Sequence, residues 1–288
     1  MKKLIAILTC VCIYATANAQ DAEGMITFET ADSEVKIHIT GTSIATIDWG
    51  DGTIVESNIE DIWGFFNGDQ THYYHNSGTY TITIIGANIT YLNCSKNQLT
   101  SLDVSKNPAL KELFCENNQL TKLDVSKNPK LERLHCYINR LTSLDVSKNT
   151  ELTELVCVAN QLTSLDVSKN TELTRLICSG NQLTNLDVSK NTALERLYCS
   201  YNQLKKLDVS KNTKITLLSC CKNNFSETAL GKLFRTLHSN LFDVEKIISI
   251  GKNNMGIISE KSIRIAQERG WRIDTLRCED DEGETIDI

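Results

Sequence analysis

The sequence predicts a mainly β protein with minor helix, built around a solenoid of about seven coils of 21 residues. A cysteine recurs every 21 residues, an asparagine follows each cysteine by three positions, and leucines keep the same frame. Self-similarity at a fixed period of roughly 20–50 residues is the signature of stacked repeats, in which each coil contacts only its neighbours. The recurring cysteines are Cys94, Cys115, Cys136, Cys157, Cys178, Cys199 and Cys220.

The chain begins with the three-part pattern of a secretory signal peptide, residues 1–19. Lys2 and Lys3 form a basic start, residues 4–14 are apolar, and Ala17-Asn18-Ala19 offers small residues for cleavage. The apolar stretch is too short to span a bilayer, and no later segment is long and apolar enough to do so. We therefore expect an exported protein without membrane insertion, at the cell surface, extracellular or periplasmic. Lipid attachment is the weaker alternative, because the cysteines in this stretch fit a lipoprotein signal poorly.

Residues 20–87 do not repeat, and their pattern predicts a β domain. Apolar residues alternate with other residues over 35–39 and again over 80–84, which is typical of half-buried strands. Between these segments, Asp51-Gly52 is a hairpin signal.

The same region carries two motifs, Ile-Asp-Trp-Gly-Asp-Gly-Thr at 47–53 and Gly-Thr-Tyr-Thr-Ile-Thr-Ile at 78–84, with His72 and Tyr74 between them. Together they resemble a PKD-type, immunoglobulin-like sandwich domain. The resemblance implies a β-sandwich-like, PKD-like cap at the N-terminal end of the solenoid. It leaves open whether this domain binds calcium or glycan.

Residues 88–224 hold the repeats. The coil from Leu110 to Lys130 reads Leu-x-x-Leu-x-Cys-x-x-Asn-x-Leu-x-x-Leu-Asp-Val-Ser-Lys-Asn-Pro-x. This pattern resembles bacterial leucine-rich repeats of the short, internalin-like kind, with Cys115 in a position that leucine usually occupies. We expect the leucines, cysteine and valine to point inward and to stack on their equivalents. Asn118 should also point inward and bond backbone groups where the strand turns.

The cysteines of an exported protein would normally suggest disulfides. The seven repeat cysteines are expected to be free, buried thiols, because the Cβ vectors of stacked positions run parallel and suit a disulfide poorly. Cys221 points the other way from Cys220, and Cys278 lies near the C-terminus. Whether Cys221 and Cys278 pair is left open by the sequence.

The repeat breaks at Phe225, and residues 225–277 predict a C-terminal α/β cap. Terminal repeats are atypical because they must cover an open end of the core. Residues 278–288 are strongly acidic and are expected to form a solvated tail. The expected elements of the cap are a helix over 229–237 capped by Ser226, a strand over 247–253, a helix from Ser259 or Ser262 to Glu268, and a strand over 271–274.

Composition and motifs argue against several classes of function. The formal net charge is −6 and there is no basic stripe, which excludes a typical nucleic-acid-binding protein. No glycine-rich phosphate loop, Gly-x-Ser-x-Gly or His-Glu-x-x-His is present, so we predict no catalytic residue and no cofactor. His72 and His75, near Asp48 and Asp51, form an incomplete metal-ligand set. The column of repeat aspartates is expected to be neutralised by a parallel column of lysines.

The two halves of each coil differ in how strictly they repeat. The Leu-Asp-Val-Ser-Lys-Asn half is nearly invariant, whereas most of the variation falls on outward positions around the cysteine strand. A half that contacts a partner should vary, and an apolar, aromatic exposed patch marks an interaction site. Drift on an undemanding surface is the alternative. The candidate binding residues are Phe114, His135, Tyr137, Ile138, Val156, Val158, Ile177, Tyr198 and Tyr201.

We therefore predict an exported, monomeric, non-enzymatic module that mediates protein–protein interaction or adhesion through this variable face. Glycan binding is an alternative, in which Phe114, Tyr137, Tyr198 and Tyr201 would act as stacking platforms. A structural component of the cell envelope is a further alternative, in which changing these aromatic residues would alter only solubility.

Overall fold

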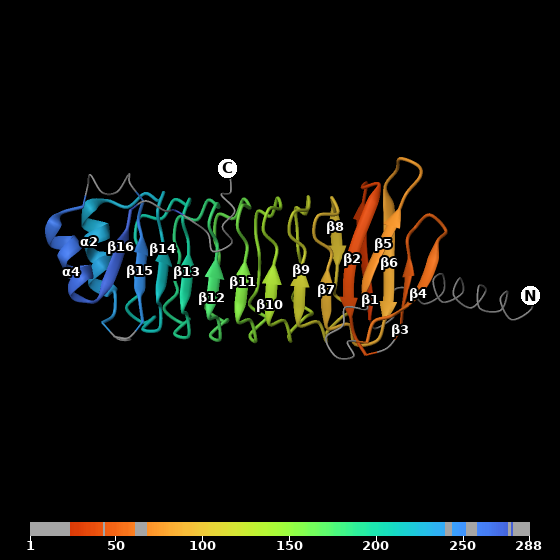
Figure 1. The fold of residues 1–288 in the computed structure, drawn as a ribbon, viewed down its shortest axis with the longest axis horizontal. Coiled ribbons are helices and arrows are strands. Elements are labelled where there is room, and N and C mark those ends of the chain that lie inside the picture. The colour runs from red at the N-terminus through yellow and green to blue at the C-terminus, as the bar shows by residue number, and fades with distance from the viewer. Residues whose placement is uncertain are drawn as a thin grey trace, which may run out of the picture.

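The computed structural model describes residues 24–42, 44–60, 68–239, 244–251, 258–275 and 278. The described chain is mainly β with two helices, as predicted, and its strands are stacked along one long axis (Figure 1). A β-rich N-terminal region lies at one end of the stack and the helices lie at the other. The predicted signal peptide and residues 279–288 of the predicted tail lie outside the described residues.

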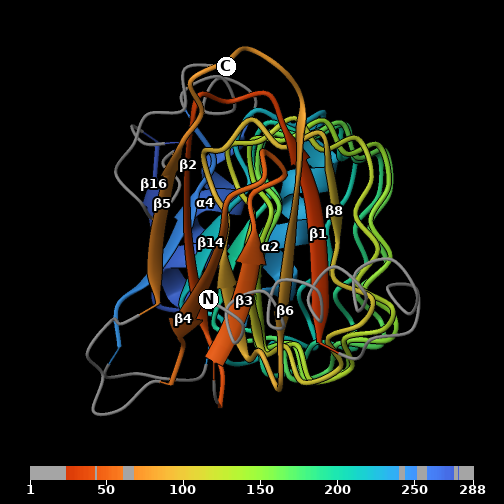
Figure 2. The same ribbon diagram turned by 90° about the vertical axis from the view of Figure 1, so that its right-hand side faces the viewer.

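The described residues of the N-terminal region contribute six strands to two sheets. Strands β1, β3, β4 and β6 belong to a five-stranded sheet of order β4-β3-β6-β1-β8, whereas β2 and β5 form one end of an eleven-stranded sheet. Figure 2, which views the molecule from this end, shows the strands as two layers. Their bounds are β1 (Met25–Thr30), β2 (Glu34–Thr40), β3 (Ile44–Asp48), β4 (Ile54–Asn58), β5 (Asp69–Tyr73) and β6 (Tyr80–Gly86).

The repeats contribute one short strand each to the eleven-stranded sheet, whose order is β16-β15-β14-β13-β12-β11-β10-β9-β7-β2-β5. Neighbouring repeat strands are parallel and in register, so that Leu134 lies opposite both Leu113 and Leu155. Each strand has three residues because the coil must turn soon after it. The bounds are β7 (Tyr91–Asn93), β9 (Glu112–Phe114), β10 (Arg133–His135), β11 (Glu154–Val156), β12 (Arg175–Ile177), β13 (Arg196–Tyr198) and β14 (Leu217–Ser219).

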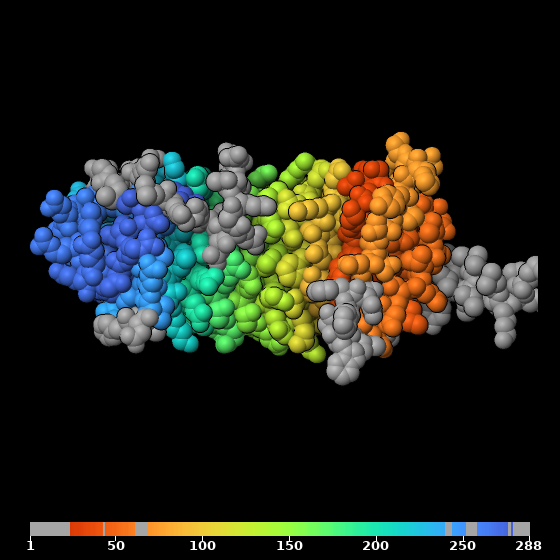
Figure 3. Space-filling model, in the orientation of Figure 1, coloured from red at the N-terminus to blue at the C-terminus, as the bar shows by residue number. Residues whose placement is uncertain are grey.

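The N-terminal strands join the repeats without a break in either sheet. Strand β2 pairs antiparallel with β7, which places His38 opposite Asn93. On the other layer, β1 pairs antiparallel with β8 (Ser101–Asp103) of the first repeat. One hydrophobic core runs from Ile26 to Trp271. The space-filling view shows the corresponding continuous, elongated surface (Figure 3).

The repeat cysteines are free and buried, as the sequence predicts. Each is 0% exposed and lies in the core with the inward leucines and valines. Burial raises the pKa of the Cys157 and Cys220 thiols to about 12, so these side chains stay protonated and unreactive at neutral pH.

Two columns of buried asparagines bond the backbones of neighbouring repeats. Asn139 donates through Nδ2 to the Cys115 and Cys136 carbonyls and accepts at Oδ1 from the Leu120 amide, which confirms the inward asparagine predicted for this position. The second column lies on the opposite side, where Asn149 donates to the Val125 and Asn128 carbonyls. Each asparagine replaces bonds that the turning backbone cannot make to itself.

The C-terminal region continues the sheet and adds helices. Its elements are α2 (Glu227–Thr236), β15 (Lys246–Ser249), α4 (Glu260–Glu268) and β16 (Trp271–Asp274). The Ser226 side chain accepts a hydrogen bond from the Ala229 amide at 3.2 Å. Ser226 is therefore the N-cap of α2, as the sequence predicts. A disulfide joins Cys221 to Cys278 and closes a loop that spans this whole region.

Candidate binding face

The outward side of the eleven-stranded sheet over β2, β7 and β9–β14 is called the sheet face below. Parallel register places its side chains in rows that cross the strands. The central row starts on the N-terminal region and continues through the repeats. Its members are His38, Asn93, Phe114, His135, Val156, Ile177, Tyr198 and Ser219.

The half of the sheet face nearer the C-terminus is closed to solvent. Val156, Val158, Ile177 and Tyr198 form a hydrophobic cluster separate from the main core, and each is 2–3% exposed. The expectation that these four predicted site residues are exposed is therefore wrong. Apolar side chains on adjacent strands pack against one another across the face.

The Cys221–Cys278 disulfide lies beside this cluster. Cys221 is on the sheet face, where its sulfur lies 3.3 Å from the Ser200 hydroxyl. The disulfide therefore brings Cys278 onto the face at the last repeat. Ser200 and Ser219, which neighbour it, are likewise buried.

The half nearer the N-terminus is more open. Phe114, His135 and Tyr137 are partly exposed, and Ile138 is 38% exposed. Tyr201, the remaining candidate, is 40% exposed and lies apart from them, in the same repeat as the buried Tyr198. The structure therefore brings four of the nine candidates together as an accessible group, which we call the open half of the sheet face.

Aromatic side chains contact one another along this open half. The ring centroids of His38 and Tyr91 are 5.2 Å apart, those of Tyr91 and Phe114 are 5.4 Å apart, and those of Phe114 and His135 are 4.5 Å apart. The repeat pattern did not identify His38, which lies before the repeats, or Tyr91, which lies at the start of the first repeat. The alternation over residues 35–39 could have placed His38 on the outward side of its strand.

A row of charged residues runs beside the aromatic side chains. Arg133 forms an ion pair with Glu112, and Arg175 Nη1 lies 2.5 Å from Glu154 Oε1. His135 Nε2 lies 3.2 Å from the same Glu154 oxygen. His135 and Arg175 lower the pKa of the Glu154 carboxyl, outweighing its partial burial. The two arginine–glutamate pairs are the cross-strand ion pairs that alternating charges indicate.

The aspartates on the opposite side of the repeats have a local role. The Asp124 carboxylate accepts a hydrogen bond from the Ser126 amide at 2.8 Å, and the same bond recurs in the other coils. This bond lowers the pKa of Asp124. No group of three or more side chains that could hold a metal ion is found among the described residues.

His72, part of the incomplete metal-ligand set in the sequence, packs against other side chains of the N-terminal region. His72 stacks on Trp49 with ring centroids 4.8 Å apart, and its Nε2 lies 2.8 Å from Asp51 Oδ2. Although burial opposes the shift, hydrogen bonds from Thr53 and His72 lower the pKa of Asp51 to about 2. His75 is exposed. These contacts join His72 to Trp49 and Asp51 within the packing of this region.

Comparisons with known proteins agree with this geometry. Residues 87–128 match a family model for two copies of leucine-rich repeats. No curated protein matches the chain. No catalytic family is indicated. Within the described residues, none of the helices combines the length and apolar character needed to cross a membrane.

Among solved structures, one internalin supports a leucine-rich-repeat type of fold, and two further structures are similar over part of the chain. An internalin, inlF, from Listeria monocytogenes is 18% identical, covers 64% of this chain and 53% of its own, and has a TM-score of 0.53. The functional domain of InlJ from the same species, described as including a cysteine ladder, is 31% identical, with coverages of 57% and 44% and a TM-score of 0.34. A leucine-rich-repeat protein from Leptospira interrogans is 18% identical, with coverages of 63% and 59% and a TM-score of 0.45. This chain spans about half the length of the two Listeria structures.

Proposed function

We propose that this leucine-rich-repeat protein, whose structural neighbours include bacterial internalins, is an exported, non-enzymatic module that binds another protein, as an adhesin would, through its sheet face. One observation carries the proposal. The side chains that vary most from coil to coil are held on a backbone frame that hardly varies, and part of this set is accessible. Solenoids present extended binding surfaces of this kind.

The open half of the sheet face is the proposed contact surface. Phe114, His135, Tyr137 and Ile138 offer aromatic and apolar area, with Arg133 beside them, 5.8 Å from the Phe114 ring centroid. Aromatic residues and arginine are enriched at protein interfaces and supply much of the binding energy. Val156, Val158, Ile177 and Tyr198 form a packed cluster beside this surface, against which Tyr137 packs. Tyr201, a candidate from the sequence, is exposed but lies apart from the open half.

The proposed organisation follows the predicted boundaries. Residues 88–224 would form the solenoid of about seven coils. A PKD-like domain of residues 20–87 would cover one open end, and residues 225–277 would cover the other. The continuous core and the unbroken sheets support this organisation, because an uncovered end would expose leucines to water. N-terminal sequencing of the exported protein tests the predicted cleavage, which would leave Gln20 as the first residue.

A capture experiment tests the proposed surface. The bait is the purified protein beside a variant with Phe114→Ser, Tyr137→Ser and Ile138→Ser, and the target is an extract of neighbouring or host cells. The matched control carries Ile44→Ser and Ile54→Ser, which change exposed apolar residues of the other sheet. We expect a protein partner to be retained by the parent and the control and lost by the sheet-face variant.

The outcomes separate the alternatives. Capture that survives glycosidase treatment of the extract but not protease treatment supports a protein partner, and the reverse pattern supports the glycan alternative. Equal capture by the parent and by a folded sheet-face variant contradicts the proposed surface. Capture by neither favours a structural component of the cell envelope.

A further inference from the structure

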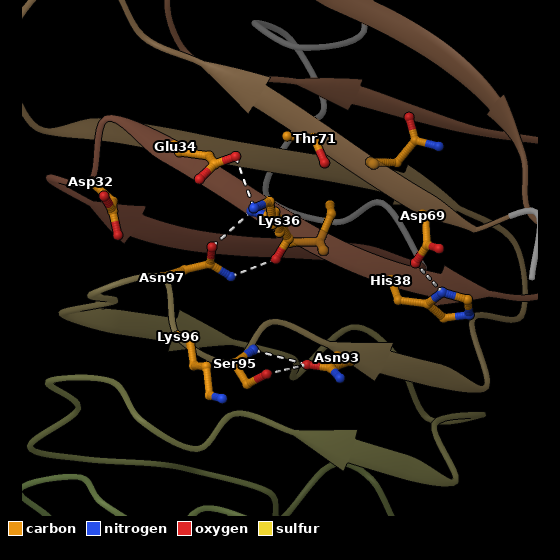
Figure 4. Close-up of a pocket in the computed structure, with 12 residues that line it drawn as sticks. Asp32, Glu34, Lys36, His38, Asp69, Thr71, Asn93, Ser95, Lys96 and Asn97 are labelled. Carbon is orange, nitrogen blue, oxygen red and sulfur yellow. Dashed lines mark hydrogen bonds and ion pairs between the residues drawn. The ribbon is translucent and has the colours of Figure 1, made fainter.

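A polar cleft lies where the N-terminal region meets the first repeat (Figure 4). It is on the sheet face, because its lining residues His38 and Asn93 stand in the same row as Phe114. Its volume is about 590 Å³, within the range of small-ligand sites. One wall comes from β2 and β5, and the other from the end of β7 and the loop that follows it. Residues about 60 positions apart in the sequence, such as Lys36 and Asn97, therefore meet in one site.

The two walls are fixed to each other before any ligand arrives. Asn97 Oδ1 accepts from the Lys36 amide at 2.8 Å, and its Nδ2 donates to the Lys36 carbonyl at 2.7 Å. The Asn97 carbonyl accepts from the Thr30 hydroxyl at 2.5 Å. Asn97 thus does for the N-terminal region what the later asparagines do between repeats. A preformed cleft binds without the cost of ordering its own walls.

The lining mixes hydrogen-bond donors with acceptors. The Asp32 carboxylate, the Thr71 hydroxyl and the Lys96 ammonium make no hydrogen bond or ion pair with the described residues. Asn93 and Ser95 bond each other, and His38 Nδ1 lies 2.7 Å from Asp69 Oδ1. Figure 4 shows Asp32 and Lys96 toward one end of the cleft and the His38–Asp69 pair toward the other.

This mixture suits a neutral, hydroxyl-rich ligand better than an ion. Three carboxylates (Asp32, Glu34 and Asp69) and two ammonium groups (Lys36 and Lys96) line the cleft, so neither sign of charge dominates. An anion would meet the carboxylates, and no metal-holding group of side chains occurs in the described ranges. Each hydroxyl of a sugar both donates and accepts, and can use both kinds of partner.

An aromatic surface adjoins the cleft. His38, which lines it, makes a T-shaped contact with Tyr91, and Tyr91 contacts Phe114 on the next strand. Aromatic rings bury the apolar C–H faces of a ligand while neighbouring polar groups fix its orientation. A second polar cleft of about 450 Å³, around Thr121 and Asp124, has no aromatic residue in its lining.

We propose that the cleft between β2, β5 and the first repeat binds a saccharide, with Asp32, Thr71 and Lys96 bonding its hydroxyl groups and His38 and Tyr91 providing the adjoining aromatic surface. This site is additional to the proposed protein-binding function. The two are separable, because the capture variant changes Phe114, Tyr137 and Ile138 and leaves the cleft side chains in place.

The test uses the purified protein and saturation-transfer NMR. The probes are glucose, galactose, mannose, N-acetylglucosamine, cellobiose, lactose and N,N′-diacetylchitobiose, each titrated separately. We expect at least one probe to bind, and a variant with Asp32→Asn and Thr71→Val to bind it at least about tenfold more weakly, a change equal to ~1.4 kcal/mol. Thr71→Val keeps the side-chain shape and replaces the hydroxyl with a methyl group.

Thr121→Val is the matched control, because it removes a threonine hydroxyl from the second polar cleft. It should leave probe binding unchanged. Saturation transfer from the protein to none of the probes would overturn the proposal. So would equal affinity of the parent and the double variant, or an equal loss in the Thr121→Val control. Circular dichroism establishes that each variant is folded, so a loss of binding is attributable to the cleft.

Discussion

The invariant side of each repeat and the sheet face belong to the same 21-residue unit, yet they use their polar groups differently. On the invariant side, Asn149 bonds two backbone carbonyls and Asp124 bonds a backbone amide. On the sheet face, Glu154 contacts the side chains of His135 and Arg175. A side chain that completes the backbone cannot change without loss, whereas one that contacts other side chains can. The difference explains where the sequence repeats and where it varies.

The largest effect is expected from an inward asparagine. Asn160 Nδ2 donates to the Cys136, Cys157 and Val158 carbonyls, and Oδ1 accepts from the Leu141 amide. Asn160→Ala leaves the buried Leu141 amide without its acceptor and removes one hydrogen bond from each of the three carbonyls, which keep bonds from the Asn139 and Asn181 side chains and the Ile138 amide. It should lower the free energy of unfolding by about 4–5 kcal/mol. Urea denaturation followed by circular dichroism measures it. Arg140→Ala, at an exposed position, is the control, and a similar cost for both variants would contradict the comparison.

The disulfide should have the next largest effect. It closes a loop of 57 residues, and the chain-entropy relation gives ~4 kcal/mol of stabilisation for a loop of that size. The variant Cys221→Ser with Cys278→Ser should therefore denature at lower urea, and reducing agent should shift the parent but not the variant. The seven repeat cysteines form no disulfide, so reducing agent should not affect them and the variant shows its effect in the absence of a disulfide. An unshifted parent in reducing agent would contradict this role for the disulfide.

A smaller effect is expected on the invariant side, where two charged columns can be compared. Asp124→Ala removes the acceptor of the Ser126 amide and should cost about 1 kcal/mol. Lys127→Ala, which removes only the neighbouring charge, should cost less than ~0.5 kcal/mol. Thermal denaturation of both variants measures the difference. Equal costs would show that the aspartates stabilise the protein by balancing charge rather than by bonding the backbone of the turn.

The smallest effect is expected on the sheet face itself. Glu154→Gln should cost less than ~1 kcal/mol at neutral pH, because the ion pairs it breaks are partly exposed. The folded-state pKa of Glu154 lies below its usual value, so its contribution is complete above about pH 4.3 and is lost as the pH falls through the folded pKa. The free energies of unfolding of parent and variant, measured as a function of pH, should therefore converge below the folded-state pKa of Glu154. A constant difference across pH would contradict the assignment.

Much of the fold could be predicted from local pattern, and much of the site could not. The period located the strands, the buried cysteines and the inward asparagines, because each residue in a stack has the same neighbours as its equivalent. The predicted exposure on the sheet face was wrong for four residues, because the outward direction of a side chain does not determine what lies over it. These residues are Val156, Val158, Ile177 and Tyr198. His38 and Tyr91 were missed because strand pairing across the junction, not the repeat, brings them to Phe114.

By itself the sequence determined the repeating architecture, the free thiols and the side of each coil that varies. Those properties depend on contacts at one fixed separation of 21 residues. Only the tertiary structure decided that Cys221 bonds Cys278, that half of the sheet face is closed, and that Asn97 fastens β2 to the first repeat to form a cleft. These features join segments at irregular separations, where no periodicity constrains the pairing and only the packed chain selects it.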